Sequence, residues 1–379
     1  MTKRTKDLAA SILSKSSDCC TSSSNRISSS NSGVEKDALV FEKRIALSKA
    51  ITLIESHSIA HTQQADLLLN HVTKTREKSA FRVGIAGAPG SGKSSLIEAL
   101  GTYILDHSDH SDDEIGRFSP EKIAVVCVDP SSSITGGSIL GDKTRMMELS
   151  RHPRAFVRPS PSKGVLGGLT SYTNDVVSLC EAAGYELVLV ETVGLGQSEI
   201  DISQTVDMLV LIVPPGGGDG LQGAKKGILE VADMLVVNKA DGQLLTAART
   251  TAADYIGATH YFRSRMEGWE TPPVLLASAE TGDGLEDLWK EIQRYREVVI
   301  NTNALQSKRS AQARYWMWKT VQDLITNKIK ADEDMKLTAE ALEIALEQGN
   351  IAPRAAASKL LDLTTRSLAK GPHTDKNQS

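Results

Sequence analysis

The chain has 379 residues, of which 40% are hydrophobic and 24% are charged, a composition that suits one large folded domain with extensions, or two domains. Its formal net charge of −4 at pH 7 gives no electrostatic reason to expect nucleic-acid binding. No stretch approaches the roughly 20 apolar residues of a spanning helix, and the 4 cysteines include no Cys-x-x-Cys pair, so the sequence predicts no membrane span, disulfide framework or zinc knuckle.

The first 35 residues are rich in serine, lysine and arginine and contain few acids. This composition is typical of a mitochondrial transit peptide and equally typical of a disordered tail. A transit peptide would direct the protein to the mitochondrial matrix, and without one we expect the protein in the cytoplasm. Over residues 36–79, apolar residues at helical spacing predict two amphipathic helices.

From residue 80 to residue 300, apolar strands alternate with helical patterns. The predicted strands are 81–86, 122–128, 186–191, 207–213, 234–238 and 274–277. Such alternation predicts an α/β fold, a mainly parallel sheet with helices on both faces. A helical stretch, 170–183, lies between the second and third predicted strands, and a right-handed crossover through it would make those two strands parallel.

Residues 301–370 read as a charged helical arm, and residues 371–379 as a disordered polar tail. Apolar residues recur at helical spacing in this arm, which has little core of its own. We therefore expect the arm to bury that surface against a second subunit, giving a homodimer. The alternative is a helical cap on the same subunit.

The segment 87–94, GAPGSGKS, matches the phosphate-binding pattern G-x-x-x-x-G-K-[ST] between a strand and a helix. Its glycines let backbone N–H groups turn toward phosphates, the Lys93 ammonium would contact the β- and γ-phosphates, and the Ser94 hydroxyl would bind Mg²⁺. The predicted nucleotide-binding residues of this loop are Gly87, Ala88, Pro89, Gly90, Ser91, Gly92, Lys93, Ser94 and Ser95.

A second motif, Asn238-Lys239-Ala240-Asp241, follows another apolar strand. The Asp241 carboxylate can accept hydrogen bonds from the N1–H and N2–H₂ edge of guanine, and adenine offers no such pair of donors. The motif therefore predicts binding of GTP and GDP rather than ATP. Ser278 and Ala279, at the end of the last predicted strand, are expected beside the base.

Acidic residues end two neighbouring predicted strands, Asp129 the second and Glu191 the third. A single acid at a strand end is often only a cap, but two beside a phosphate-binding loop predict a magnesium site. Glu191 opens the segment ETVG, whose Gly194 N–H can meet the γ-phosphate. Because Leu195, not glutamine, follows Gly194, we expect slow intrinsic hydrolysis.

At these residues the chain resembles the methylmalonyl-CoA mutase-associated GTPases, the MeaB/ArgK group. The resemblance covers roughly residues 40–300. The segments that carry it are RIALSKAITLIES (44–56), GAPGSGKSS (87–95), VDPSSSITGGSILGDKTRM (128–146), PSPSKGVLGGLT (159–170), ETVGLGQSE (191–199), PPGGGDGLQGAKKGI (214–228) and NKADG (238–242).

The resemblance implies a SIMIBI-class G domain with three switch segments and a helical dimerisation arm. It implies that Asp142 and Arg145 lie in the first switch, with Asp142 among the magnesium ligands Ser94, Asp129, Asp142 and Glu191. Residues 191–199, with Gln197, would form the second switch, and Asp219, Gln222 and Lys225 a third that responds to a partner. The candidate catalytic residues are Lys93, Arg145 and Lys225. Gly220 departs from the acid expected beside Asp219.

The family's members bind a cobalamin-dependent acyl-CoA mutase, gate its loading with adenosylcobalamin and protect it, so the resemblance implies a GTP-hydrolysing chaperone of such a mutase. One alternative is a metal-delivery GTPase of hydrogenase or urease maturation, which would need a Cys/His metal site that we do not find in the sequence. Another is a P-loop kinase or transport ATPase, against which Asp241 argues. A nucleotide-dependent scaffold with negligible turnover is the non-enzymatic alternative.

Overall fold

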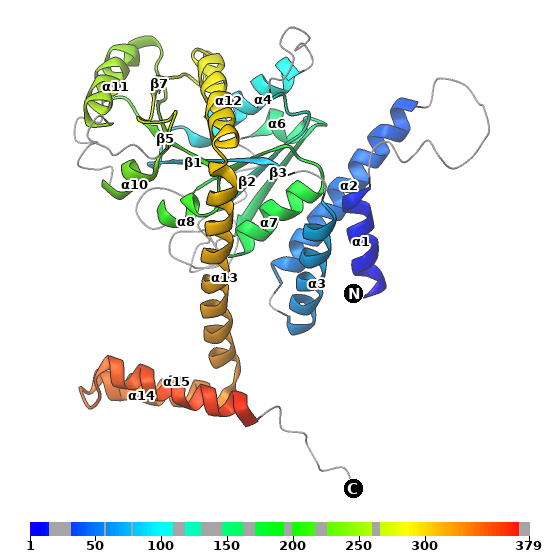
Figure 1. Cartoon of the computed structure of the whole chain (residues 1–379), viewed down its shortest axis with the longest axis vertical. Coiled ribbons are helices and arrows are strands. Elements are labelled where there is room, and N and C mark those ends of the chain that lie inside the picture. The colour runs from blue at the N-terminus through cyan, green and yellow to red at the C-terminus, as the bar shows by residue number, and fades with distance from the viewer. Residues whose placement is uncertain are drawn as a thin grey trace, which may run out of the picture. The chain divides into compact units, whose positions relative to one another are not determined.

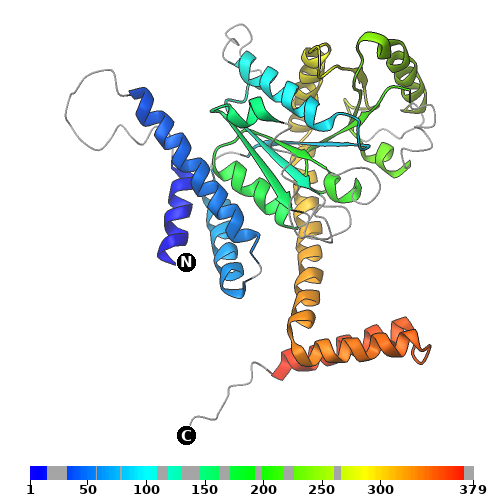
Figure 2. The same ribbon diagram turned by 180° about the vertical axis from the view of Figure 1, so that it is seen from behind.

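The computed structural model describes residues 1–14, 32–56, 58–76, 79–108, 118–129, 146–161, 171–192, 199–216, 226–259 and 266–370. The chain divides into two compact units, Met1–Gln312 and Ala313–Ser379. Figure 1 shows the sheet and its helices in the first unit, and Figure 2 shows the same chain from behind.

The described part of the first unit contains a seven-stranded sheet in the order β3-β2-β4-β1-β5-β6-β7. Each neighbouring pair is parallel. The predicted α/β fold with a mainly parallel sheet is therefore confirmed. Strands β1, β4, β5 and β6 are buried along their whole length, as expected for parallel strands covered on both faces. The strands are β1 (Phe81–Gly87), β2 (Ile123–Asp129), β3 (Ala155–Pro161), β4 (Leu187–Glu191), β5 (Met208–Val213), β6 (Met234–Val237) and β7 (Val274–Leu276).

Strand β3 is absent from the sequence-based prediction, which went from the second strand directly to the helix before the third. The segment contains Pro159 and Pro161, which cannot donate to a strand ladder and so argue against a central strand. In the structure β3 lies at the edge of the sheet and pairs with β2. Strands β2 and β4 are neighbours and parallel, as predicted for the second and third strands.

Helices cover both faces of the sheet. One face packs against α4 (Lys93–His107), α6 (Met147–Arg151) and α12 (Leu285–Asn301), and Figure 2 shows α4, in cyan, in front of the sheet. The other face packs against α7 (Ser171–Ala182), α8 (Glu199–Ser203), α10 (Lys226–Val231) and α11 (Leu245–Thr259), the last preceded by a short 3-10 helix, η3 (Gly242–Leu244). Alternate residues of a strand point to opposite faces, so Val83 and Ile85 pack with α4, whereas Ala86 packs on the α7 side.

Three helices precede the sheet: α1 (Lys3–Leu13), α2 (Ser32–Ile54) and α3 (Ile59–Thr75). They pack against one another and against α7, and lie beside it in Figure 1. Helices α2 and α3 lie where two helices were predicted over residues 36–79, although α2 begins earlier, at Ser32. Helix α1 lies within the first 35 residues, for which the sequence left a transit peptide and a disordered tail open: Ala9 and Ile12, three residues apart on one face, are fully buried. This short stripe is hidden in a Ser- and Lys-rich sequence, and residues 15–31 lie outside the described part of the chain.

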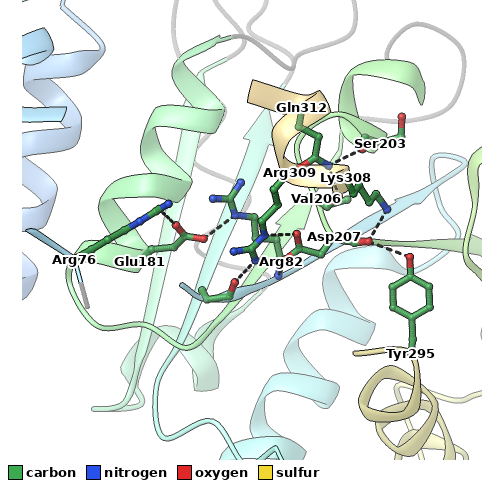
Figure 3. A network of polar contacts seen from close by, with 11 residues as sticks. Arg76, Arg82, Glu181, Ser203, Val206, Asp207, Tyr295, Lys308, Arg309 and Gln312 are labelled. Carbon is green, nitrogen blue, oxygen red and sulfur yellow. Dashed lines mark hydrogen bonds and ion pairs between the residues drawn. The ribbon is translucent and has the colours of Figure 1, made fainter. Parts of the chain in front are cut away.

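A chain of buried charges occupies the amino ends of β1 and β5 (Figure 3). Glu181, at the end of α7, accepts a hydrogen bond from Arg82 Nε at 2.7 Å and pairs with Arg76. Asp207, just before β5, accepts from the Arg82 N–H at 2.8 Å and from Arg309 Nε at 2.8 Å. Burial alone would lower the pKa of Arg309, but its hydrogen bond to Asp207 and the charge of Asp207 raise it.

The same network holds the start of α13 (Ala304–Ala331) on the first unit. Lys308 Nζ and the Tyr295 hydroxyl donate to the Asp207 carbonyl at 2.5 and 3.2 Å. Gln312 Nε2 donates to the carbonyls of Ser203, in α8, and Val206 at 3.0 and 2.7 Å. The first residues of α13 are therefore fixed to the segment between α8 and β5.

The second unit is helical, as the predicted arm requires. It contains the rest of α13, then α14 (Glu333–Glu347) and α15 (Pro353–Lys370), which pack against each other. Large hydrophobic side chains of this unit are exposed, among them Met317, Trp318, Val321, Leu324, Ile325, Leu337, Ile344 and Leu361. Across the described residues of both units, no helix is both long and apolar enough to span a bilayer.

Candidate nucleotide-binding site

The carboxyl end of β1 lies where the order of the sheet reverses. Strand β1 is flanked by β4 on one side and β5 on the other. The chain leaves β1 through α4 toward β2, and later passes from β4 to β5 on the opposite side of β1. In open α/β sheets such a switch point forms a crevice at the carboxyl ends of the strands. The loop 87–92 stands at this crevice.

The glycines of this loop are required by its backbone. Gly90 and Gly92 have φ angles of 79° and 88°, in the region that favours glycine. A Cβ at Gly92 would lie 2.4 Å from Asn238 Nδ2, and one at Gly87 would lie 2.4 Å from the Ile212 carbonyl oxygen. The loop can therefore pass close to β5 and to the residues after β6 only because side chains are absent.

Lys93 is the first residue of α4 and is buried. Its ammonium donates to the carbonyl oxygens of Gly87 at 2.9 Å and Ala88 at 3.2 Å, so it lies across the mouth of its own loop. The N-terminal N–H groups of a helix and an adjacent ammonium favour a bound phosphate. Ser95, the next residue but one, is exposed.

The hydroxyl of Ser94 donates to Glu191 Oε1 at 2.6 Å. Glu191 is the last residue of β4 and stands beside Ile85 of β1, and both Ser94 and Glu191 are buried. A hydroxyl and a carboxylate are the oxygen donors that Mg²⁺ takes in proteins, so this pair fits the ion. Asp129 ends β2, the strand next to β4, so its backbone lies at the same edge of the sheet.

The residues after β6 contact the loop directly. Asn238 is buried, and its Nδ2 donates to the carbonyl oxygens of Ser91 at 2.9 Å and Gly92 at 3.3 Å. Lys239, next along the chain, is exposed and has a φ of 59°, which is uncommon for a residue with a side chain. Asn238 therefore ties the predicted base-reading segment to the predicted phosphate-binding loop.

Asp241 is held by the loop after β7. Its Oδ2 accepts a hydrogen bond from Ser278 Oγ at 2.5 Å. Ser278 Oγ in turn accepts from the N–H groups of Glu280 at 3.2 Å and Thr281 at 3.1 Å. Because these donors occupy the hydroxyl's lone pairs, its one proton is directed to Asp241. This arrangement fixes the carboxylate as an acceptor, which suits recognition of a donor pair on a base.

The turn that orders Ser278 was not identified as part of the site in the sequence. Gly284 has a φ of 76°, and a Cβ there would lie 2.1 Å from the Leu276 carbonyl oxygen. The Ser278 N–H donates to the Asp283 carbonyl at 2.9 Å, which closes the turn. The sequence Thr-Gly-Asp-Gly at 281–284 is a turn signal that could have revealed it. Ala279, predicted beside the base, lies in the same turn.

Several predicted site residues lie outside the described part of the chain. They are Asp142 and Arg145 of the expected first switch, Gly194 and Gln197 of the second, and Asp219, Gln222 and Lys225 of the third. The backbone of Asp129 is described and its side chain is not. The structure thus brings together the residues of the phosphate loop, Glu191, Asn238, Asp241 and Ser278.

A parallel α/β sheet with this loop at its switch point, and with an Asn-Lys-x-Asp segment beside it, defines a P-loop GTPase fold. Comparison with known proteins places the chain within that class. The family model described as methylmalonyl-CoA mutase-associated GTPase MeaB matches residues 47–334. The chain therefore belongs to the MeaB family of GTPases.

Individual relatives agree with this membership. The "Methylmalonic aciduria type A homolog, mitochondrial" of Mus musculus is 39% identical over 332 residues, covering 85% of this chain and 77% of the relative. A "Putative GTPase" of Caulobacter vibrioides is 44% identical over 323 residues, covering 85% of this chain and 94% of the relative. A solved structure named "LAO/AO transport system kinase" superimposes with a TM-score of 0.63 at 29% identity, covering 90% of this chain and 100% of that one.

Proposed function

We propose that this protein binds GTP and Mg²⁺ at the carboxyl edge of its sheet, hydrolyses the β–γ phosphoanhydride bond, and serves as a chaperone of a cobalamin-dependent acyl-CoA mutase. The observation that carries the nucleotide assignment is the pairing of Asp241 with Ser278, beside a loop tied to Asn238. The description of the family supports methylmalonyl-CoA mutase as the client.

The phosphates of a bound nucleotide would replace the backbone carbonyl oxygens that now accept hydrogen bonds from Lys93. Lys93 would exchange the Gly87 and Ala88 carbonyl oxygens for β- and γ-phosphate oxygens, which carry more charge. The N–H groups of the loop and of Gly194 would add donors. Asp241 would accept from the N1–H and N2–H₂ groups of guanine with both carboxylate oxygens, because Oδ2 keeps a lone pair beside its bond from Ser278. Lys239 and Ala279 would lie beside the base.

Mg²⁺ would be held by the Ser94 hydroxyl and Glu191, whose oxygens already lie 2.6 Å apart, with Asp129 and Asp142 as further ligands. When bound, the ion would offset negative charge on the β- and γ-phosphate oxygens. Glu191 would keep the Ser94 hydroxyl oriented toward the phosphates. The close contact between these two buried side chains supports the pair as the ion's anchor.

Hydrolysis would be slow until a partner docks. The expected water-orienting glutamine is missing after Gly194, so an added cation would have to stabilise the transition state. Lys225 is the first candidate and Arg145 the second, because both stand in segments that the resemblance assigns to switches. Asp219, Gln222 and Gln197 would transmit docking of the mutase to this cation, as part of gating adenosylcobalamin loading.

We also propose that the second unit forms a homodimer. Trp318 and Leu324 of α13 are 63% and 55% exposed, and burying them against a second copy would remove this apolar surface from water. Light scattering of a Leu324→Lys protein should report a monomer, with Gln322→Lys as the matched control. A Leu324→Lys protein that stays dimeric would exclude α13 from the interface.

The comparisons with relatives support two locations for the protein. The mouse relative's name specifies mitochondria, which supports the mitochondrial matrix. The similarity to a Caulobacter protein equally supports a cytoplasmic protein. Fluorescence imaging of a carboxyl-terminally tagged chain decides between them: a diffuse signal outside mitochondria would exclude the matrix.

GTP turnover measured with and without purified methylmalonyl-CoA mutase tests the proposed function. We expect slow turnover alone, stimulation by the mutase, and retention of the mutase on protein loaded with a non-hydrolysable GTP analogue. Lys225→Ala should lose most of the stimulation and keep basal turnover, whereas Lys74→Ala, an exposed lysine on α3, should behave as wild type. Absence of both stimulation and retention would refute the mutase as client.

A further inference from the structure

A second groove of the first unit lies where α1, α2, α6 and β3 meet, lined by residues of none of the nucleotide-site segments. Its volume is about 760 Å³, within the usual range of small-molecule sites. Five cations line it: Arg4 from α1, Arg44 and Lys49 from α2, Arg151 from α6 and Arg158 from β3. No aspartate or glutamate occurs among the described residues of its lining.

These cations are poorly neutralised within the part of the chain that the structure describes. Arg158 pairs with Glu55 at 2.9 Å, and Arg44 donates to the Ser150 carbonyl at 3.2 Å. Arg4, Lys49 and Arg151 have no hydrogen bond or ion pair there, and all three are exposed. Asp7 and Glu42 line the adjoining hollow without lying within ion-pair distance of them.

The electrostatics of this groove favour an anion. The whole chain has a net charge of −4, yet five cations gather here, of which one pairs with Glu55, and Asp7 and Glu42 lie in the adjoining hollow that Arg4 and Lys49 also line. Like charges in one cavity raise its positive potential and attract anions. Guanidinium groups in particular match the oxygens of a phosphate with two parallel hydrogen bonds.

One of these five cations, Arg158, also has a buried donor. The Nε–H of Arg158 is buried and has no hydrogen-bond acceptor in the described structure, although Nη2 of the same side chain pairs with Glu55. A buried donor without an acceptor is unfavourable. Either an anion bound in the groove or the buried Oε1 of Glu55, in the same ion pair, could supply this acceptor.

Besides the cations, the lining has four apolar side chains and three hydroxyl residues, namely Phe41, Ile45, Phe156 and Val157, and Ser48, Thr52 and Ser150. Phe41 and Ile45 of α2 are 65% and 38% exposed, and Phe156 of β3 lines the same groove. Exposed aromatic and branched side chains next to guanidinium groups suit a planar organic body attached to the anion. An inorganic anion alone would leave this apolar surface in water.

We propose that this groove binds a phosphate ester of an aromatic or other planar organic molecule, at a site separate from the nucleotide site. The phosphate would lie among Arg44, Arg151 and Arg158, and the organic body against Phe41. The assignment does not rest on the proposed GTPase or chaperone function. The proposed phosphate-ester site is therefore the same whether or not the protein binds a mutase.

Calorimetric titration with 1-naphthyl phosphate tests the proposal. The full-length protein is first saturated with GDP and Mg²⁺ so that the nucleotide site is filled. We expect saturable binding with one molecule per chain, and weaker binding of inorganic phosphate and of uncharged 1-naphthol. No saturable binding by the wild type would overturn the proposal, and inorganic phosphate binding as tightly would overturn the role of Phe41.

Matched pairs of substitutions locate the site. Lys49→Gln with Arg151→Gln removes two exposed, unpaired cations, so it should leave the melting temperature unchanged and weaken 1-naphthyl phosphate binding by about tenfold or more. Lys74→Gln with Arg249→Gln removes two exposed cations of α3 and α11 and should leave the affinity unchanged. Equal affinities in both double variants would refute the groove as the site. GDP affinity should be the same in all.

Discussion

Charged residues gather at both ends of the parallel strands: at the amino edge, where β1 and β5 begin, and at the carboxyl edge, where the strands end. The two sets of charges have different kinds of partners. At the amino edge, the Arg82 guanidinium pairs with Glu181 and the Arg309 guanidinium pairs with Asp207, and the second pair holds the start of α13 within the first unit (Figure 3). At the carboxyl edge, Lys93 donates to neutral backbone carbonyl oxygens and Asp241 accepts from a neutral hydroxyl. Opposite charges meet at the first edge, whereas at the second edge the hydrogen bonds described for Lys93 and Asp241 are to neutral groups that a nucleotide could replace. The first arrangement favours stability and the second favours binding.

The largest effect should come from the carboxyl edge. Lys93→Ala removes the ammonium that would stabilise charge on the transferring phosphoryl group, so turnover of GTP should fall by about 10³-fold or more. The free energy of unfolding of the nucleotide-free protein should change by only about 1 kcal/mol, because the lost hydrogen bonds are to backbone carbonyls.

Single-turnover GTP hydrolysis and urea unfolding of the same preparation measure both quantities. Lys290→Ala, an exposed lysine on α12, is the matched control and should change neither. Wild-type turnover in Lys93→Ala would mean that the loop after β1 does not hold the reacting phosphate.

The amino edge should show the reverse pattern. Asp207→Asn keeps the shape of a fully buried side chain but leaves the Arg309 guanidinium without its countercharge, so the free energy of unfolding should fall by about 3 kcal/mol. GTP affinity of the folded protein should remain within about twofold of wild type, because the proposed nucleotide site lies at the other edge.

Urea unfolding and GTP titration below the melting temperature separate these effects. Glu286→Gln, which breaks an exposed ion pair with Lys290, should cost less than about 0.5 kcal/mol. If Asp207→Asn were no more destabilising than Glu286→Gln, the buried network would not be what stabilises this edge.

Much of the carboxyl edge could be predicted from the sequence because its chemistry is local. The loop 87–94 and the segment 238–241 are contiguous motifs at strand ends, and parallel strands end at one edge. Strand β3 was missed because Pro159 and Pro161 conceal an edge strand. Helix α1 was missed because its buried stripe is short and lies in a polar sequence.

The amino edge could not be predicted because its contacts are not local. Arg82 and Asp207 each look like an exposed charge at the start of a predicted strand, and Arg309 follows 102 residues after Asp207. Their pairing depends on β1 and β5 being neighbours and on where α13 begins. Periodicity gives the elements, but it does not say which charges the fold will bury together.

The most direct test of the carboxyl edge as a guanine-reading site is titration of Asp241→Asn with GTP and with XTP. The substitution puts an amide donor where guanine also presents donors, so GTP binding should weaken by about 1–3 kcal/mol, and XTP, which has an acceptor there, should bind more tightly than to wild type. Asp283→Asn, in the same turn as Ser278, should keep the wild-type preference for GTP. Unchanged GTP affinity in Asp241→Asn, with no gain for XTP, would contradict the assignment.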